Sequence, residues 1–462
     1  MPDAKYALGI DYGTESARAL LVDVADGREA ATAVYQYANG VITDRLPDGG
    51  TRLPAHDWAL QDPEDYLRAL DATIPECLRQ AGVRSEQVIG IGTDFTACTM
   101  LPVRRDGTPL CTLPEFRAEP HAWVKLWKHH AAQPEADRVN DAARRLGEPW
   151  LQRYGGRISS EWFFPKALQI LDEAPRIYDA ADRLIEGADW IIWQLCGRET
   201  RNLCTAGYKA IWSKRDGFPR REFFAALDPG QKFAAVVDAK MSRDILPLGA
   251  RAGGLTDAMA ARLGLRPGTA VAAGNVDAHV AVPACTVTGP GKMVMIMGTS
   301  ICHMVCGAAE RQVPGQCGVV EDGILPGLFG FEAGQSAVGD IFAWFVRTCV
   351  PGSYQARARR RKMGVHDLLA EKAAAYRPGQ TGLLALDWWN GNRSVLVDAN
   401  LTGLMLGMHL GTRPEEMYRA LLEATAFGTY IIIRTFEEHG VPIEEIYCCG
   451  GLPERNDLLM QI

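Results

Sequence analysis

The sequence predicts an α/β protein of two similar lobes, on the basis of three observations. The chain opens with strand patterns over residues 7–11, 18–24 and 29–37, separated by turn residues. A helix pattern from 63 to 78 follows, and then a buried strand pattern over 88–92. This order of elements combines a strand meander with crossover helices, as in α/β proteins. An apolar strand, a Gly-Thr turn and a second strand recur over 292–305, as in residues 7–24. This recurrence indicates an internal duplication, with one small-residue hairpin turn in each half.

The first helix pattern begins with clear capping signals. Asp62 stands at the N-cap position and Pro63 at the first helical position. Apolar residues then repeat at helical spacing as far as Leu78. The three-strand opening before this helix differs from the strand and helix that begin a dinucleotide-binding fold.

Composition narrows the classes of protein and partner. With 462 residues, 47% hydrophobic and 23% charged, the chain has the make-up of a soluble globular protein with two or three domains. A net charge of −7 gives no basic stripe, so we expect neither a nucleic-acid nor a membrane partner. The start of the chain lacks the order of a signal peptide, and we expect a cytoplasmic location. No feature fixes the oligomeric state, and a homodimer is compatible with the sequence.

The twelve cysteines are scattered and mostly lie in apolar stretches. That pattern favours buried thiols in a reducing compartment over a disulfide framework. Cys302, His303 and Cys306 have the residue types of a metal site. Alternation along a strand would divide them between two faces, and no second pair of ligands follows. We therefore interpret them as core residues.

Two hairpin turns contain residues that can hold phosphate. Glycine backbone N–H groups and hydroxyl donors in such a turn can form an anion-binding nest. One such turn is weak evidence, because most are plain hairpins, but two at corresponding places in two halves favour function. The chain has neither a P-loop nor a dinucleotide fingerprint to explain them. The residues concerned are Gly13, Thr14 and Ser16 in the first turn and Gly298, Thr299 and Ser300 in the second.

Two aspartates stand next to predicted strand ends. Asp11 directly precedes the first turn, where a carboxylate beside phosphate would need an intervening cation such as Mg²⁺. The alternative is an aspartate that stabilises its own turn. Asp277 follows the apolar strand 269–273, where it could accept the proton of an alcohol that attacks a γ-phosphate. Its position is equally consistent with a capping aspartate.

Longer strings in the chain resemble the FGGY family of carbohydrate kinases. They comprise residues 7–23, the Gly-x-x-Asp of 274–277, residues 297–300 and residues 447–451. Their order and spacing match the family over nearly the whole chain. Four further strings resemble the ribulokinase branch of that family: GTDFTACT at 92–99, HAWVKLWKHH at 121–130, NVDAHV at 275–280 and GTSICHM at 298–304.

The resemblance implies a fold and a reaction. The fold would be two-lobed, of the actin and hexokinase type (ribonuclease H-like), with a ligand cleft between the lobes. The reaction would move the γ-phosphate of ATP to the terminal 5-hydroxyl of L-ribulose and give L-ribulose 5-phosphate, a step in L-arabinose breakdown. ATP and Mg²⁺ would be the cofactors, and a small ketopentose sugar the partner.

The resemblance also assigns roles by position. Asp277 would be the general base, and Asp11 would help to hold Mg²⁺. Lysine and glutamate side chains can fix sugar hydroxyls that would otherwise be buried without partners. The sugar contacts would be Ala97, Lys209, Asp277 and Glu332, and the nucleotide contacts would be the two turns with Gly450, Gly451 and Asn456.

The expected domains divide near residue 285. Residues 1–285 would form the N-terminal lobe with the sugar site, the first turn and the base, and residues 286–462 the nucleotide-binding C-terminal lobe. Family members continue beyond the helix pattern at 456–462, so we expect the second lobe to be C-terminally truncated. We therefore also expect this chain to bind ATP weakly, and its activity is in question.

Two other hypotheses about the function remain beside that of a ribulose kinase. The nearer is a kinase for another ketopentose or a polyol such as glycerol, because side-chain geometry decides which hydroxyls are accepted. The second is a non-catalytic ATP clamp of the actin and chaperone kind, which shares a two-lobed nucleotide cleft. A sugar-responsive regulator is disfavoured because no helix-turn-helix precedes the first strand.

Overall fold

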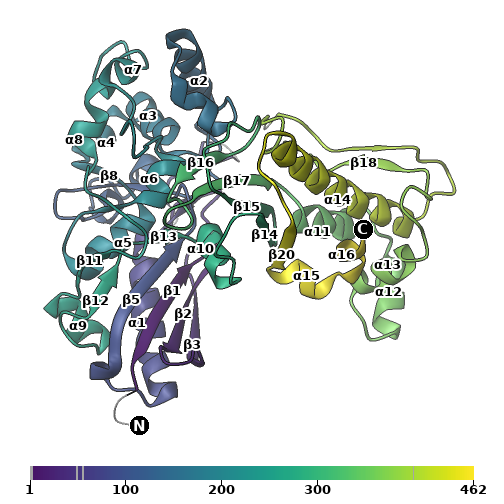
Figure 1. Cartoon of the computed structure of the whole chain (residues 1–462), viewed down its shortest axis with the longest axis horizontal. Helices are drawn as coiled ribbons and strands as arrows, with labels where there is room; N and C mark the ends of the chain where they lie inside the picture. Colours follow the sequence, from purple (N-terminus) through teal and green to yellow (C-terminus); the bar gives the residue numbers. More distant parts are fainter. Residues whose placement is uncertain (1–3, 48–49, 55–56, 399) are drawn as a thin grey trace. The chain divides into compact units, whose positions relative to one another are not determined.

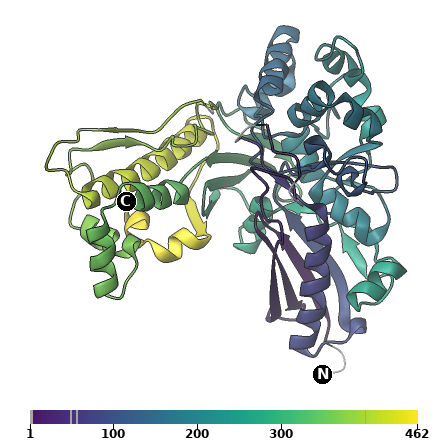
Figure 2. The same ribbon diagram turned by 180° about the vertical axis from the view of Figure 1, so that it is seen from behind.

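A computed structural model provides the structure, which describes residues 4–47, 50–54, 57–398 and 400–462. The chain divides into two compact units. The first comprises residues 1–151, 158–280 and 320–327, and the second comprises 152–157, 281–319 and 328–462. Figures 1 and 2 show their elements from opposite sides.

The first unit is built on a mixed sheet with the predicted meander at one edge. Strands β1 (Tyr6–Tyr12), β2 (Ser16–Asp23) and β3 (Glu29–Gln36) are antiparallel neighbours. Strand β5 (Val88–Phe95) lies parallel to β1 on its other side. The sheet order is β11-β12-β5-β1-β2-β3, with β11 at Arg251–Gly254 and β12 at Ala270–Ala272, and the two-residue strand β13 (Asn275–Val276) also pairs with β5. The predicted opening strands are confirmed to within two residues.

One face of this sheet is buried under helices. The sequence of β1 alternates, so that Leu8, Ile10 and Tyr12 are buried while Asp11 lies on the opposite face. Helix α1 (Pro63–Ala81) packs against β2 and β3 and lies along the meander in Figure 2. Its predicted cap is confirmed, since the Asp62 side chain accepts a hydrogen bond from the N–H of Glu64. Burial of the alternate apolar residues therefore fixes which side chains remain on the open face.

The rest of the first unit surrounds this sheet with short elements. A second small sheet has the order β4-β7-β6-β8, formed by Leu60–Gln61, Val124–Lys125, Met100–Val103 and Arg183–Glu186. Strands β9 (Arg201–Asn202) and β10 (Ile245–Leu246) pair in parallel. The helices are α2 (Gln133–Leu146), α3 (Phe163–Glu173), α4 (Pro175–Ala180), α5 (Gly187–Cys196), α6 (Leu203–Lys209), α7 (Arg221–Ala225), α8 (Val236–Lys240) and α9 (Asp257–Leu263). Helix α10 (Asp277–Ala284) begins in the first unit and ends in the second, since the boundary follows Val280.

The second unit repeats the strand pairing of the first. Strands β14 (Lys292–Met297) and β15 (Ile301–Gly307) form the predicted hairpin, and β17 (Phe329–Gln335) continues it on the far side of β15. Strand β20 (Glu445–Cys449) lies parallel to β14, as β5 lies parallel to β1. The sheet order is β16-β17-β15-β14-β20, with β16 at Gly318–Glu321. These pairings bear out the duplication inferred from the sequence.

Helices cover the second sheet around a core that includes Met293, Phe331, Phe345 and Tyr418. The longest of them in the described residues, α14 (Pro414–Glu438), is amphipathic and carries Tyr418 on its buried side. A search of the described helices found none long and apolar enough to cross a membrane. The other elements are α11 (Gly339–Thr348), α12 (Gly352–Arg360), α13 (Val365–Ala373), α15 (Gly451–Arg455), α16 (Asp457–Gln461), β18 (Leu384–Leu386) and β19 (Leu404–Leu406).

Candidate active site

Polar residues form a row across the open face of the first sheet, near the carboxyl ends of its parallel strands. Asp11 on β1 pairs with Arg18 on β2 and with Asp94 on β5. Asp94 pairs in turn with Asn275 on β13. Directly paired residues share a face of the sheet and lie side by side. Three neighbouring strands therefore bring the predicted Asp11 next to a second carboxylate, Asp94, that the sequence did not single out.

The electrostatics of this row centre on Asp94. Burial raises its pKa well above the ordinary value, and the negative charges of Asp11 and Asp277 raise it further. A hydrogen bond with Asp11 acts in the same direction. On the other side, Arg18 Nη1 lies 3.9 Å from Asp11 Oδ2, but both side chains are largely exposed and the pair is weak. Asp94 therefore retains its proton to a higher pH than an ordinary aspartate.

Asp277 is the first residue of helix α10. The two-residue strand β13 follows β12 and ends at Val276, so Asp277 lies directly beyond a strand end, as predicted. Its Oδ1 accepts a hydrogen bond of 2.6 Å from the N–H of Ala278. The side chain is half-buried, and its charge acts on Asp94. The carboxylate is thus held at the start of α10, close enough to the carboxylate row for its charge to act on Asp94.

The chemistry of these donors suits a hard cation bound partly through water. Among the described residues, no three His, Cys, Asp or Glu side chains are grouped closely enough to hold a metal by themselves. Mg²⁺ usually takes only one or two protein carboxylates and completes its shell with water and substrate phosphate. Asp11, with Asp94 as its paired neighbour, fits that pattern.

The first turn is held by hydrogen bonds from two directions. The N–H of Gly13 donates to Ser16 O at 3.0 Å, which closes the turn. Gln61 Nε2 donates to Thr14 O at 2.7 Å, and Trp127 Nε1 donates to Thr14 Oγ1 at 3.1 Å. An indole N–H can only donate, so the Thr14 hydroxyl keeps its own proton for another acceptor. The turn is therefore rigid and presents a donor.

Ala97 and Lys209 also lie in the first unit. Ala97 is half-buried in the loop that follows β5, directly before Cys98, whose φ of 57° is left-handed. Lys209 ends helix α6, is only 4% exposed, and its Nζ lies 5.7 Å from the ring of Trp162. Asn202 caps that helix by accepting a hydrogen bond from the N–H of Thr205. An ammonium buried to this degree is suited to fixing a polar ligand.

The second turn lies in the second unit and, like the first, is closed by a main-chain hydrogen bond. The N–H of Gly298 donates to Ser300 O at 2.9 Å. At the start of α11, the N–H groups of Val338 and Gly339 donate to the carbonyls of Thr299 and Gly298. These bonds fix the main chain of the turn and leave the Thr299 and Ser300 side chains to other partners.

Gly450 lies against the strand that leads to this second turn. Its φ is 93°, and a Cβ there would stand 2.4 Å from the carbonyl oxygen of Met297. Only glycine permits that approach. The neighbouring Gly451 begins α15 and has open space, since its nearest neighbour to a Cβ would be Arg455 at 4.0 Å. Position 450 therefore requires glycine, whereas position 451 has space for a Cβ.

Glu332 and Asn456 are the remaining predicted residues, and both lie in the second unit. Glu332 is 7% exposed on β17. Asn456 is buried, and its Oδ1 accepts a hydrogen bond of 3.0 Å from the N–H of Leu459, which makes it the N-cap of α16. The helix predicted over 456–462 is confirmed as α16, and the short helix α15 precedes Asn456.

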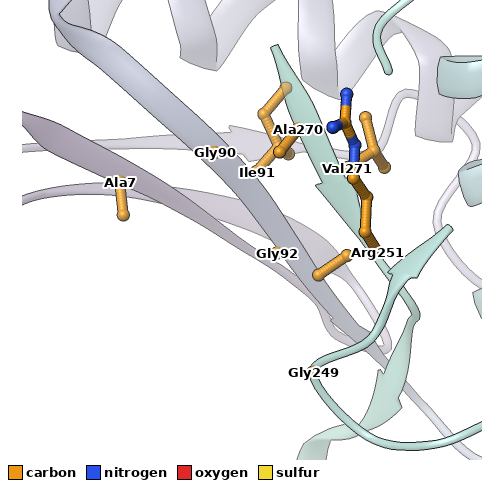
Figure 3. A pocket seen from close by; sticks show the side chains of 9 residues that line it. Ala7, Gly90, Ile91, Gly92, Gly249, Arg251, Ala270 and Val271 are labelled. Atoms are coloured by element: carbon orange, nitrogen blue, oxygen red, sulfur yellow. The ribbon is translucent and has the colours of Figure 1, made fainter. Parts of the chain in front are cut away.

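A pocket of about 260 Å³ also lies on the first sheet, where Ala7, Gly90 and Gly92 leave space beside β12 (Figure 3). Arg251 stands at its side and donates to the carbonyls of Gly253 and Gly268. None of the predicted site residues lines this pocket. It is therefore separate from the carboxylate row.

Comparison with known proteins identifies the family. The N-terminal domain of the FGGY family of carbohydrate kinases matches residues 6–283, and its C-terminal domain matches residues 293–462. The chain belongs to the FGGY family of carbohydrate kinases. The expected family is thereby confirmed, and the chain is a sugar kinase that takes a sugar and a nucleotide phosphate donor as substrates.

Relatives within the FGGY family are similar over nearly the whole chain. A ribulokinase of Geobacillus thermodenitrificans is 59% identical over 458 residues, which are 99% of this chain and 80% of that protein. A ribulokinase of Mycolicibacterium smegmatis is 55% identical over 99% of this chain and 81% of its own length.

Among solved structures, xylulose kinase from Rhodospirillum rubrum gives a TM-score of 0.77 at 20% identity and covers 99% of this chain and 83% of that one. Glycerol kinase from Plasmodium falciparum, solved with ADP, gives 0.70 at 15% identity over 99% and 84%. At such low identity these structures support the fold alone, and the predicted two-lobed α/β class is confirmed.

Proposed function

We propose that this FGGY kinase phosphorylates L-ribulose at its 5-hydroxyl with ATP and serves L-arabinose catabolism in the cytoplasm. The observation that carries the proposal is identity of 55–59% to several ribulokinases over almost all of the chain. Pairwise identity at this level is far above the 15–20% that accompanies the xylulose and glycerol kinase folds. The two aspartates of the first unit, Asp11 and Asp277, support the proposal, because a carboxylate can serve as a general base or a Mg²⁺ ligand.

In the proposed reaction, Asp277 accepts the proton of the 5-hydroxyl. The oxygen then attacks the γ-phosphorus, and ADP leaves with the electrons of the broken bond. The N–H of Ala278 donates to Oδ1 of Asp277, which holds the carboxylate at the start of α10. Asp11 would hold Mg²⁺ through water, and the ion would neutralise phosphate charge. General-base catalysis of this kind contributes about 10²- to 10⁴-fold to the rate.

The residues proposed to bind the two substrates lie in both units. Ala97 and Lys209 would contact the sugar in the first unit, and Glu332 in the second is proposed for the same ligand. The first turn (Gly13, Thr14, Ser16) and the second turn (Gly298, Thr299, Ser300) would hold ATP phosphates. Gly450 and Gly451 would lie near the adenosine, while Asn456 supports that region as a helix cap. The proposal also includes a domain boundary near residue 285. It includes assembly of the protein as a homodimer.

A ketose panel tests the proposal. ADP release would be followed with L-ribulose, D-ribulose, both xyluloses and glycerol, and the product would be located by nuclear magnetic resonance. We expect release to depend on L-ribulose and the phosphate to appear on C5. Preference for glycerol or xylulose would favour another kinase of the family. Release that no sugar stimulates would favour the ATP clamp and contradict the proposal.

A further inference from the structure

Lys166 is a fully buried lysine that the proposed mechanism does not use. It lies in the first turn of α3 with 0% of its surface exposed. Its Nζ donates one hydrogen bond to Cys98 O and another to Leu126 O, each of 2.7 Å. Burial lowers its pKa to about 8, while Cys98, Glu186 and Glu161 act against that shift. Burying an ammonium costs free energy unless its N–H groups have acceptors. Lys166 has two such acceptors, and they belong to two separate segments of the chain.

The first acceptor belongs to the loop that contains Ala97. In this loop, Thr96 Oγ1 and Thr99 Oγ1 lie 2.8 Å apart, and Thr99 Oγ1 donates to Ala97 O at 3.4 Å. The N–H of Thr96 donates to Tyr12 O, which is the last residue of β1. Between these bonds Cys98 adopts a left-handed conformation. Such a conformation persists only where surrounding contacts hold it, and Lys166 provides one of them.

The second acceptor belongs to the segment that supports the first turn. Leu126 follows β7, and its N–H donates to Ala59 O at 3.0 Å. The next residue is Trp127, whose indole N–H donates to Thr14 Oγ1. Lys166 therefore holds a carbonyl one residue away from the side chain that orients Thr14.

We propose that Lys166 is a positioning residue that fixes the sugar loop 96–99 and the Trp127 support of the first turn relative to each other. An ammonium suits this role because it has three donors on a long stem and can serve two carbonyls from separate segments. Its loss would let both segments relax, so that the acceptor hydroxyl and the phosphate donor are no longer aligned. Misplacement of about 1 Å can cost about 10²-fold in rate. The inference rests on the proposed function of Ala97 and of the first turn.

The test compares two lysines in the same unit. Lys166→Met removes both hydrogen bonds at similar side-chain volume. Lys240→Met is the matched control, because the Nζ of the half-buried Lys240 also donates to two carbonyls, Tyr178 O and Ala181 O, which belong to neither segment. We expect the KM for L-ribulose to rise at least about tenfold and kcat to fall in Lys166→Met. Lys240→Met should lower the melting temperature without those kinetic changes.

Thiol labelling gives a readout that does not depend on turnover. Cys98 is 2% exposed, and alkylation followed by peptide mass spectrometry reports how often its loop opens. We expect faster labelling of Cys98 in Lys166→Met, with the fully buried Cys111 as the internal reference. Lys166→Gln, which keeps one amide donor group, should give an intermediate rate and replaces the methionine variant if that one does not fold.

The outcomes separate the two proposals. Wild-type KM and an unchanged Cys98 labelling rate in Lys166→Met would overturn the positioning role, as would equal changes in Lys240→Met. If the wild-type chain phosphorylates no ketopentose at all, the proposed function fails. In that case the labelling comparison still decides whether Lys166 holds the loop.

Discussion

Asp94 on β5 is the direct strand partner of Asp11 on β1, and both side chains lie on the open face of the first sheet. Burial, the charges of Asp11 and Asp277, and a hydrogen bond with Asp11 raise the pKa of Asp94 well above its ordinary value. The pair therefore combines one carboxylate that binds a proton readily with one that is available to a cation. We therefore expect replacement of Asp11 and replacement of Asp94 to have different effects on the rate.

The first prediction concerns that inequality. Asp94→Asn keeps the shape and a hydrogen-bond donor toward Asp11, so we expect kcat to fall by less than about tenfold. Asp11→Asn removes the carboxylate proposed for Mg²⁺, and we expect a fall of about 10²-fold or more, with weaker Mg²⁺ dependence. Steady-state rates measured across a Mg²⁺ titration compare the two. Equal losses would show that Asp94 acts as a second charged ligand.

The sequence predicted the parts of this site that local signals determine. The meander, α1 with its Asp62 cap, and both Gly-Thr turns follow from alternation and turn residues within a few positions of one another. Asp94 lies in the string at 92–99 that resembles ribulokinases, but no role was predicted for it, because an aspartate inside a strand pattern gives no local signal for a proton or metal site. Its role depends on the register of β5 beside β1, which is a contact between distant segments.

The supports of the site were missed for the same reason. Gln61 and Trp127 reach Thr14 from positions far away in the sequence. Lys166 lies in an apolar helix, where a single lysine looks like an exposed residue. Asn456, by contrast, was predicted to begin a helix, and the structure confirms this because it caps α16, while its contact with the nucleotide stays a prediction.

The second prediction concerns the proposed base. In Asp277→Asn the amide cannot accept the hydroxyl proton, so we expect kcat to fall by about 10²- to 10⁴-fold. Sugar binding, measured by calorimetry, should stay within about tenfold, because an amide still forms hydrogen bonds to hydroxyls. Turnover that persists near the wild-type level would exclude Asp277 as the base and would favour the ATP clamp.

The third prediction uses two neighbouring glycines in the second unit. Gly450→Ala places a Cβ 2.4 Å from Met297 O at a φ of 93°, so we expect a loss of at least about 1–3 kcal/mol in the free energy of unfolding and weaker ATP binding. Gly451→Ala meets only Arg455 Cζ at 4.0 Å and should be nearly neutral in stability. Chemical denaturation and nucleotide titration of both variants measure the difference. Similar behaviour of the two would contradict the assigned backbone requirement.

The fourth prediction concerns the support of the first turn. Gln61 Oε1 accepts a 2.5 Å hydrogen bond from the Tyr66 hydroxyl, while Nε2 donates to Thr14 O. Gln61→Glu replaces that donor by an oxygen, so carbonyl and carboxylate repel and a negative charge is added beside the phosphates. We expect the KM for ATP to rise at least about tenfold. Tyr66→Phe, which affects only the other end of Gln61, should change stability more than the KM for ATP.

The fifth prediction is a pH dependence of stability that originates at Glu186. This side chain is 0% exposed, and neither of its carboxylate oxygens has a hydrogen-bond partner among the described residues. Burial raises its pKa to about 8, against the opposing charge of Arg201. Between its ordinary pKa of 4.5 and about 8, the folded chain therefore binds a proton that the unfolded chain has released. The contribution of Glu186 to stability falls as the pH rises through that range.

Glu186→Gln removes this titration, so the variant should gain stability relative to wild type as the pH rises from 4.5 to 8. The gain should approach about 1.4 kcal/mol per pH unit and vanish below pH 4.5. Urea denaturation at a series of pH values measures it. Glu76→Gln is the control, because its exposed carboxylate pairs with Arg79, its pKa is lowered to about 2, and it does not titrate in that range. A difference between wild type and Glu186→Gln that does not change with pH would mean that Glu186 is ionised in the folded protein, with Arg201 and Lys166 as its compensating charges.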